Sequence, residues 1–240
     1  MMTVCDMHSH ILPGVEDGSK DPAMSVDMLR AAAGQGVEHI LATPHYYPVE
    51  SVKDFLQRRD RAARALRSAM AEAPEQLPRV YLAAEVAYRP GIGYEEDLKS
   101  LCIGDSEFML LELPFGPWGP EVLRDIRNMT CARGITPVLA HLERYLRLQK
   151  KKVLQEVLQQ GVLVQLNAEA VLQRQTRRAA LKLLKGGAVH LLGSDCHNLT
   201  SRPPNLGTAV QQLQQTRGLD RVLDRIGFIT TDILRQARSL

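Results

Sequence analysis

The sequence predicts an α/β protein whose parallel strands form a TIM-like barrel of seven βα units. Short apolar runs rich in Val, Leu and Ile alternate with longer amphipathic stretches, which is typical of strands and helices around a parallel sheet. Seven units fit a closed or nearly closed barrel better than an open sheet, although periodicity alone does not separate the two. The chain shows no internal repeat and no linker, so residues 1–240 are expected to form one domain.

The predicted strands have the length and composition of buried parallel strands. They cover residues 4–8, 37–43, 80–84, 108–113, 136–141, 162–167 and 189–194. Asp21 and Pro22 supply an N-cap and a first-turn proline for the first helix, which ends at Gly34. A capping box at residues 51–54 begins a long helix that stops before Pro74. Further helices are predicted over residues 119–133, 146–160, 173–185 and 206–217, with a last one near residues 231–239.

The composition is that of an ordinary globular protein, with 45% apolar and 24% charged residues and a net charge of +3. The run of lysines at residues 150–152 is interpreted as a solvated helix face, so no nucleic-acid partner is expected. The N-terminus lacks the pattern of a signal peptide, and no stretch approaches the roughly 18 apolar residues of a membrane helix. A cytoplasmic protein without membrane insertion is therefore predicted. Four widely spaced cysteines, Cys5, Cys102, Cys131 and Cys196, are expected to be reduced and mostly buried.

Histidines and carboxylates gather at the predicted strand ends, where parallel barrels carry their functional groups. The candidate metal ligands are His8, His10, Asp17, His45, Glu85, Glu112, His141, Asp195 and His197. A single histidine at a strand end is more often structural than a ligand, but five of the seven histidines share this placement. His39 and His190 lie near strand beginnings and are interpreted as structural, and only the sixth strand, which ends in Asn167, lacks a candidate ligand.

Imidazole and carboxylate ligands without a thiolate pair are typical of zinc, manganese or iron sites. Nine candidate ligands are too many for one ion, so a cluster of two or three divalent ions is predicted. Arg144 and Arg202 closely follow predicted ligands, and a planar guanidinium group matches a phosphate. Cys196 and Arg202 also fit the C-x5-R loop of cysteine-dependent phosphatases, but this loop lacks glycine and places an aspartate before the thiol. We interpret that match as chance.

Longer motifs surround these residues. They are His8-Ser9-His10-Ile11-Leu12-Pro13-Gly14 with Asp17-Gly18, Ala42-Thr43-Pro44-His45, Leu111-Glu112-Leu113-Pro114-Phe115, His141-Leu142-Glu143-Arg144-Tyr145, and Gly193-Ser194-Asp195-Cys196-His197-Asn198 followed by Arg202-Pro203-Pro204. With these motifs in this order, the chain resembles the PHP (polymerase and histidinol phosphatase) superfamily over nearly its whole length. Within it, the chain is most similar to the bacterial metal-dependent protein tyrosine phosphatases of capsule and exopolysaccharide operons.

The resemblance implies a distorted (β/α)7 barrel of the PHP type with three metal ions, often manganese, with iron, zinc and cobalt as alternatives. By this resemblance, one ion is held by His8, His10, Glu85 and Asp195, a second by Glu85, Glu112 and His141, and a third by Asp17, His45 and His197. The family usually has proline at the position of Leu142, a small residue at Cys196 and often aspartate at Glu16. None of these departures removes a ligand.

The resemblance also implies hydrolysis of phosphotyrosine on the tail of a bacterial tyrosine kinase that regulates capsular or exopolysaccharide synthesis. A hydroxide bridging two ions is expected to attack phosphorus in line, without a covalent enzyme intermediate. Two alternatives stay open: a small-molecule phosphatase such as histidinol phosphatase, and a noncatalytic PHP module that binds metal and a partner. Tyr46, Tyr47, Phe115 and Trp118 follow predicted ligands and are candidates either to flank an aromatic ring or simply to pack.

Overall fold

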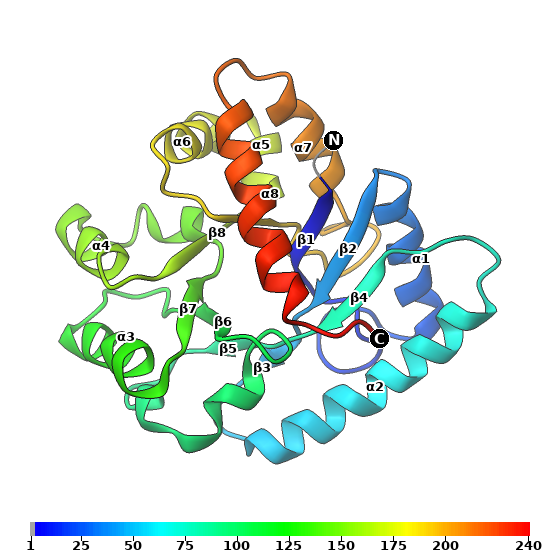
Figure 1. Ribbon diagram of the computed structural model, residues 1–240, viewed down its shortest axis with the longest axis horizontal. Helices are drawn as coiled ribbons and strands as arrows, with labels where there is room; N and C mark the ends of the chain where they lie inside the picture. Colours follow the sequence, from blue (N-terminus) through cyan, green and yellow to red (C-terminus); the bar gives the residue numbers. More distant parts are fainter. Residues whose placement is uncertain (1–2) are drawn as a thin grey trace.

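The computed structural model describes residues 3–240 and is drawn in Figure 1. Its nine strands occupy the seven predicted strand positions. Every ladder between the named strands is parallel. The strands are β1 (Val4–Ser9), β2 (Val37–Ala42), β3 (His45–Tyr46), β4 (Arg79–Leu82), β5 (Glu85–Ala87), β6 (Phe108–Glu112), β7 (Thr136–Leu139), β8 (Leu163–Asn167) and β9 (Leu191–Gly193). The predicted βα barrel is thus confirmed as a distorted TIM-like barrel.

The distortion lies in the second and third strand positions, which the sequence predicts as single strands. Each is interrupted, so β1-β2-β4 form one sheet and β3-β5-β6-β7-β8-β9 form another. Pro44 has no N–H to donate to a ladder, and the hydroxyl of Thr43 instead accepts from the Ser9 amide and donates to the Ser9 carbonyl, both at 3.1 Å. As a consequence, Glu85 begins the short strand β5 instead of ending a longer one.

The barrel closes between its first and last strands at the carboxyl ends. The amide of Asp195 donates to the carbonyl of His8 at 2.8 Å, and the amide of His10 donates to the carbonyl of Cys196 at 2.9 Å. Residues from opposite ends of the chain therefore lie side by side at this edge.

Helices surround the strands, and α8 crosses in front of them in Figure 1. The α-helices are α1 (Pro22–Ala33), α2 (Val52–Glu72), α3 (Pro120–Arg133), α4 (Lys151–Leu158), α5 (Ala168–Leu172), α6 (Arg174–Lys185), α7 (Leu206–Gln214) and α8 (Asp220–Arg235), and the 3-10 helices are η1 (Ile92–Tyr94), η2 (Glu96–Leu101) and η3 (Leu142–Tyr145). The predicted caps are confirmed, since Asp21 accepts from the amide of Met24 and Ser51 from the amide of Asp54.

The prediction of the last helix was wrong in its bounds. Helix α8 begins at Asp220, well before residue 231, and ends at Arg235. Its buried residues recur every three or four positions, beginning at Leu223 and continuing through Ile226 to Ile233, and the helix packs against β1 and β9. The predicted helix over 146–160 also begins later, at Lys151, because residues 142–145 form η3.

The core lies between the strands and these helices, and Leu41, Leu111 and Leu166 are completely buried in it. Cys5, Cys102 and Cys196 are buried free cysteines, whereas Cys131 is exposed. Within residues 3–240, no helix combines the length and the apolar character needed to cross a membrane.

Candidate metal centre

His8 and His10 are both buried at the end of β1, one inside the strand and one directly after it. Their side chains point to the same side because successive residues of a strand alternate. The two Nε2 atoms are 3.1 Å apart, and Glu85 Oε2 lies 3.0 Å from the first and 3.3 Å from the second. Asp195 Oδ1 is 3.7 and 3.4 Å from the same two nitrogens. Four ligand-type atoms therefore converge on one point.

The other ring nitrogen of each histidine has a hydrogen-bond acceptor. Nδ1 of His10 is 2.6 Å from Glu16 Oε1, and Nδ1 of His8 is 3.2 Å from Gln165 Oε1. When Nδ1 carries the proton, Nε2 presents a lone pair. With both protons on Nδ1, two lone pairs and two carboxylate oxygens face each other in a buried space, and positive charge between them is favourable. This donor set fits a divalent cation.

His141 forms a second group with carboxylates. Its Nε2 is 3.0 Å from Glu85 Oε1 and 3.3 Å from Glu112 Oε1, so Glu85 faces both groups with its two oxygens. His141 and Asp195 are the non-glycine residues with positive φ in the described chain, at 35° and 56°. Such backbone strain is uncommon and tends to occur at functional sites.

His45, His197 and Asp17 complete the set at the solvent side. His197 Nε2 is 3.5 Å from Asp17 Oδ1, and His45 Nδ1 is 3.2 Å from Glu85 Oε2. Both of these histidine nitrogens are buried without a hydrogen-bond partner of good geometry within residues 3–240. Asp17 is the exposed member, at 70% of its side chain. The structure thus brings together all nine sequence-predicted residues.

The electrostatics of the cluster favour positive charge there. Burial alone would lower the pKa of His10, but the nearby carboxylates outweigh it and raise that pKa well above its usual value. Burial would raise the pKa of Glu85, yet the surrounding histidines hold it well below its usual value. For His141, hydrogen bonds to carboxylates overcome burial and raise the pKa to about 9. The pKa of His197 shifts the other way, to about 4, because this histidine is buried and lies beside His10 and Arg202.

Arg144 and Arg202 meet at Asp195. The Nη2 of Arg144 donates to Asp195 Oδ2 at 2.5 Å, and the Nη2 of Arg202 donates to Asp195 Oδ1 at 2.6 Å. Asn167 donates to Oδ2 as well, at 2.9 Å. Burial would raise the pKa of Asp195, but His8 and His10, together with Arg144, outweigh burial and lower it. Both arginines are more than a third exposed, so their remaining donors face solvent.

Sequence reasoning missed three polar residues at this site. Glu16 was noted only as a departure from the family. Its Oε1 contacts the Nδ1 of His10, and its Oε2 accepts from the backbone amide of His45 at 2.9 Å. Gln165 and Asn167 lie on the sixth strand position, for which the sequence predicts no metal ligand. Their spacing of two residues on a strand that ends at the site was the available signal.

The residues interpreted as outside the chemistry have other contacts. Burial raises the pKa of the Cys196 thiol to about 12, and the carboxylate of Asp6 adds to the shift, so this thiol is a poor nucleophile. His39 Nδ1 lies 2.9 Å from the Tyr81 hydroxyl, and His190 Nδ1 accepts from the amide of Val164 at 3.1 Å.

Four aromatic residues near the site divide into two kinds. Tyr46 and Trp118 are buried and belong to the core. Tyr47 and Phe115 are 49% and 48% exposed. The ring of Tyr47 stacks on His45 with centroids 5.3 Å apart, and that of Phe115 stacks on His141 at 5.8 Å. Exposed aromatic surface therefore lies beside two of the candidate ligands.

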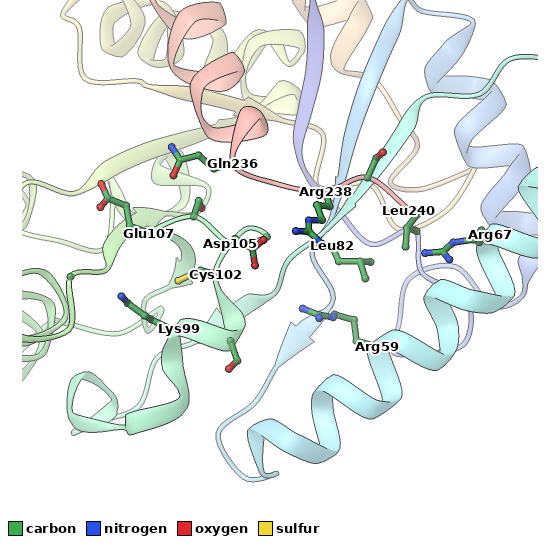
Figure 2. Close-up of a pocket in the computed structure, with 15 residues that line it drawn as sticks. Arg59, Arg67, Leu82, Lys99, Cys102, Asp105, Glu107, Gln236, Arg238 and Leu240 are labelled. Atoms are coloured by element: carbon green, nitrogen blue, oxygen red, sulfur yellow. The ribbon is translucent and has the colours of Figure 1, made fainter.

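Two cavities lie at opposite ends of the strands. One, of about 330 Å³, borders Arg144, Asp195 and Arg202. The other, of about 820 Å³, is next to residues that precede β6 and β7, and it contains none of the candidate site residues (Figure 2). Figure 2 shows basic side chains of α2 on one side of it and the carboxylate of Glu107 on the other. Of these two cavities, the smaller one therefore borders three of the candidate site residues.

The chain is similar to known proteins along most of its length. Residues 4–230 match the family model described as capsular polysaccharide synthesis, CpsB/CapC. The tyrosine-protein phosphatase CpsB of Streptococcus pneumoniae is 30% identical over 230 residues, covering 89% of this chain and 90% of the relative. The tyrosine-protein phosphatase YwqE of Bacillus subtilis is 26% identical over 231 residues, covering 89% and 85%.

Solved structures share the fold. One comes from the crystal structures of YwqE from Bacillus subtilis and CpsB from Streptococcus pneumoniae, described as unique metal-dependent tyrosine phosphatases. It is similar with a TM-score of 0.83 at 24% identity and covers 99% of this chain and 96% of its own. The phosphotriesterase homology protein of Escherichia coli has a TM-score of 0.53 at 12% identity, with coverage of 95% and 98%. Because the family model spans residues 4–230, this chain belongs to the CpsB/CapC family of capsular polysaccharide synthesis.

Proposed function

We propose that this protein is a metal-dependent protein tyrosine phosphatase. The observation that carries the proposal is the convergence of His8 Nε2, His10 Nε2 and Glu85 Oε2 on one buried point. The guanidinium groups of Arg144 and Arg202 lie next to it, on Asp195. The names of the relatives from Streptococcus pneumoniae and Bacillus subtilis support both the reaction and the substrate class.

The nine candidate ligands divide into three groups in this proposal. His8, His10, Glu85 and Asp195 would hold one ion, Glu85, Glu112 and His141 a second, and Asp17, His45 and His197 a third. Glu85 contacts both His8 and His141, so its carboxylate would serve the first and the second group. Manganese suits these nitrogen and oxygen donors, with iron, zinc and cobalt as alternatives. Divalent ions bound there supply Lewis acidity, which lowers the pKa of water and offsets charge on phosphoryl oxygens.

Arg144 and Arg202 bind the phosphate in this proposal. Each uses one Nη2 on Asp195, which leaves the rest of its donors for phosphoryl oxygens. Asp195 holds the two guanidinium groups in fixed positions, so binding of a phosphate costs little further ordering of these side chains. As negative charge redistributes over the phosphoryl oxygens, the planar forks stabilise it.

Tyr47 and Phe115 favour an aromatic leaving group. Both are half exposed and each is held flat against a histidine of the centre. A phenyl ring attached to a bound phosphate can contact these faces, whereas the leaving group of a serine phosphate offers much less apolar surface. We infer that the substrate is the tyrosine-phosphorylated tail of a bacterial tyrosine kinase that acts in capsular or exopolysaccharide synthesis, as the family membership suggests.

The test is hydrolysis of a tyrosine-phosphorylated peptide after EDTA treatment and after addition of Mn²⁺. We expect activity that needs metal, disappears in His141→Ala and survives in Cys196→Ser. Activity that ignores EDTA and is lost in Cys196→Ser would instead support the cysteine loop. Parallel assays with histidinol phosphate and a phosphoserine peptide identify a small-molecule or broad phosphatase. Bound metal without turnover of any phosphoester would indicate a noncatalytic module.

A further inference from the structure

Strand β8 carries two buried amide side chains, Gln165 and Asn167, and no candidate ligand. Residues two apart on a strand face the same side, so both amides point toward the centre. The strand lies between β7, which leads into His141, and β9, which leads into Asp195. Its side chains are therefore placed to reach candidate ligands on both neighbouring strands.

Hydrogen bonds join the two amides and their neighbours into one network. His8 Nδ1 is 3.2 Å from Gln165 Oε1, and Gln165 Nε2 donates to Asn167 Oδ1 at 2.9 Å. Asn167 Nδ2 then donates to Asp195 Oδ2, also at 2.9 Å. The backbone amide of His141 donates to Gln165 Oε1 at 2.8 Å. Three candidate ligands from three strands are connected through two side chains.

Two contacts fix which atoms of this hydrogen-bond network donate and which accept. An ionised Asp195 can only accept, so Asn167 must present its NH2 group to it and its oxygen to Gln165. The backbone amide of His141 can only donate, so Gln165 must present its oxygen there. Both constraints give the same orientation of the Gln165 amide. The proton of a neutral His8 is then on Nδ1, and its Nε2 lone pair faces His10 and Glu85.

We propose that Gln165 and Asn167 are positioning residues that fix the tautomer of His8 and the orientation of Asp195 at the same time. This inference rests on the proposed metal site, because the benefit is a pair of ligand atoms held ready for one ion. Residues that hydrogen bond to the ligands of a metal site set the orientation and basicity of those ligands.

Gly193 makes the arrangement possible. A Cβ atom at this position would lie 2.6 Å from His8 Cβ and 2.9 Å from Gln165 Nε2. Since real Cβ atoms do not approach other atoms so closely, only glycine lets β9 pass beside this pair. The contact between His8 and Gln165 therefore depends on the backbone of a third strand.

The first experiment uses the unaltered protein. Nitrogen-15 NMR of labelled histidines distinguishes the two tautomers, and a His8→Gln sample identifies the His8 signals. In the metal-free protein at alkaline pH we expect the Nδ1–H tautomer of His8. The Nε2–H tautomer would overturn the proposal directly. This measurement needs neither bound metal nor activity, so its outcome is independent of the proposed phosphatase function.

The second experiment compares variants by calorimetric titration with Zn²⁺ and by the same NMR signal. Gln165→Leu removes the acceptor and is expected to mix the His8 tautomers and weaken binding by about 10- to 100-fold. Gln165→Glu keeps an acceptor facing His8 but loses the donor to Asn167, so it is expected to retain the tautomer and to bind more tightly than Gln165→Leu. Asn167→Ala frees the Gln165 amide, and its affinity for Zn²⁺ is expected to lie between those of the two Gln165 variants. Thr230→Val, a buried polar residue on α8, is the matched control.

The outcomes separate the possible failures. Unchanged tautomer and affinity in both Gln165→Leu and Asn167→Ala would overturn the role of the two amides. Should Gln165→Leu not fold, Asn167→Ala and Gln165→Glu decide by the same readouts. If the unaltered protein does not bind Zn²⁺ or Mn²⁺, the proposed function fails, while the NMR measurement still decides whether β8 fixes the tautomer.

Discussion

The Nε2 atoms of His8 and His10 lie 3.1 Å apart and both face Glu85. Each imidazole has a hydrogen-bond acceptor at its Nδ1, the neutral amide of Gln165 for His8 and the carboxylate of Glu16 for His10. This difference matters because a carboxylate also raises the basicity of the ligand nitrogen. The two histidines are thus expected to respond differently when their supporting residues are removed.

Replacement of Glu16 by alanine is expected to weaken Mn²⁺ binding by about 10- to 100-fold. The carboxylate fixes the Nδ1 proton of His10 and also accepts from the amide of His45, so its loss frees both residues. Glu16→Asp is expected to recover part of the affinity. Calorimetric titration measures the effect, with Glu50→Ala as control because Glu50 pairs with Arg58. Equal affinity in Glu16→Ala and the unaltered protein would show that His10 does not need this support.

Metal affinity is expected to rise with pH. Without metal, His141 has a pKa of about 9 and the pKa of His10 is also raised, so at neutral pH each imidazole holds a proton that an ion must displace. As pH rises toward 9, this proton competition disappears and the dissociation constant falls, by up to about tenfold per pH unit for each proton released. Calorimetry in two buffers of different ionisation enthalpy counts the released protons. Binding without proton release at pH 7 would contradict this expectation.

The alternation of apolar and amphipathic segments was enough to predict the parallel βα units and their strand positions, and the number of units favoured a barrel. Parallel strands bring their carboxyl ends together, so residues as distant as His8 and His197 could be assigned to one site from their places on strands. Periodicity did not show where Pro44 interrupts the second strand, because that depends on how Thr43 hydrogen bonds to Ser9. Helix α8 was misplaced because no cap marks its start: Leu219 precedes it without a side-chain hydrogen bond.

The supporting residues could not be predicted for a different reason. An imidazole or carboxylate at a strand end suggests a metal by its own chemistry, whereas an amide such as Gln165 is equally common in structural hydrogen bonds. Its role depends on His8 and Asn167 lying within hydrogen-bond distance. Those distances are set by the packing of neighbouring strands, including the close approach of Gly193.

Alanine at either Arg144 or Arg202 is expected to lower kcat/KM for a phosphotyrosine peptide, on the order of 100-fold, as for removal of a donor to a developing oxyanion. Lysine restores the charge but not the planar fork and is expected to recover little of this loss. Inhibition by inorganic phosphate, measured in the same variants, should weaken in parallel. Unchanged phosphate inhibition in both alanine variants would place phosphate binding elsewhere. Arg225→Ala is a suitable control, since Arg225 contacts the carbonyls of Gly187 and Val189.

Alanine at Tyr47 or Phe115 is expected to reduce the preference for aromatic phosphoesters. A contact between aromatic rings contributes about 0.5–1.5 kcal/mol, so kcat/KM for a phosphotyrosine peptide should fall by about 2- to 10-fold for each variant. The same change should hardly affect a phosphoserine peptide, whose short side chain does not extend over these rings. Phe228→Ala controls for the loss of an exposed aromatic residue, since Phe228 is 72% exposed on α8. An equal loss on both peptides would mean that these rings stabilise the histidines they stack on and do not select the leaving group.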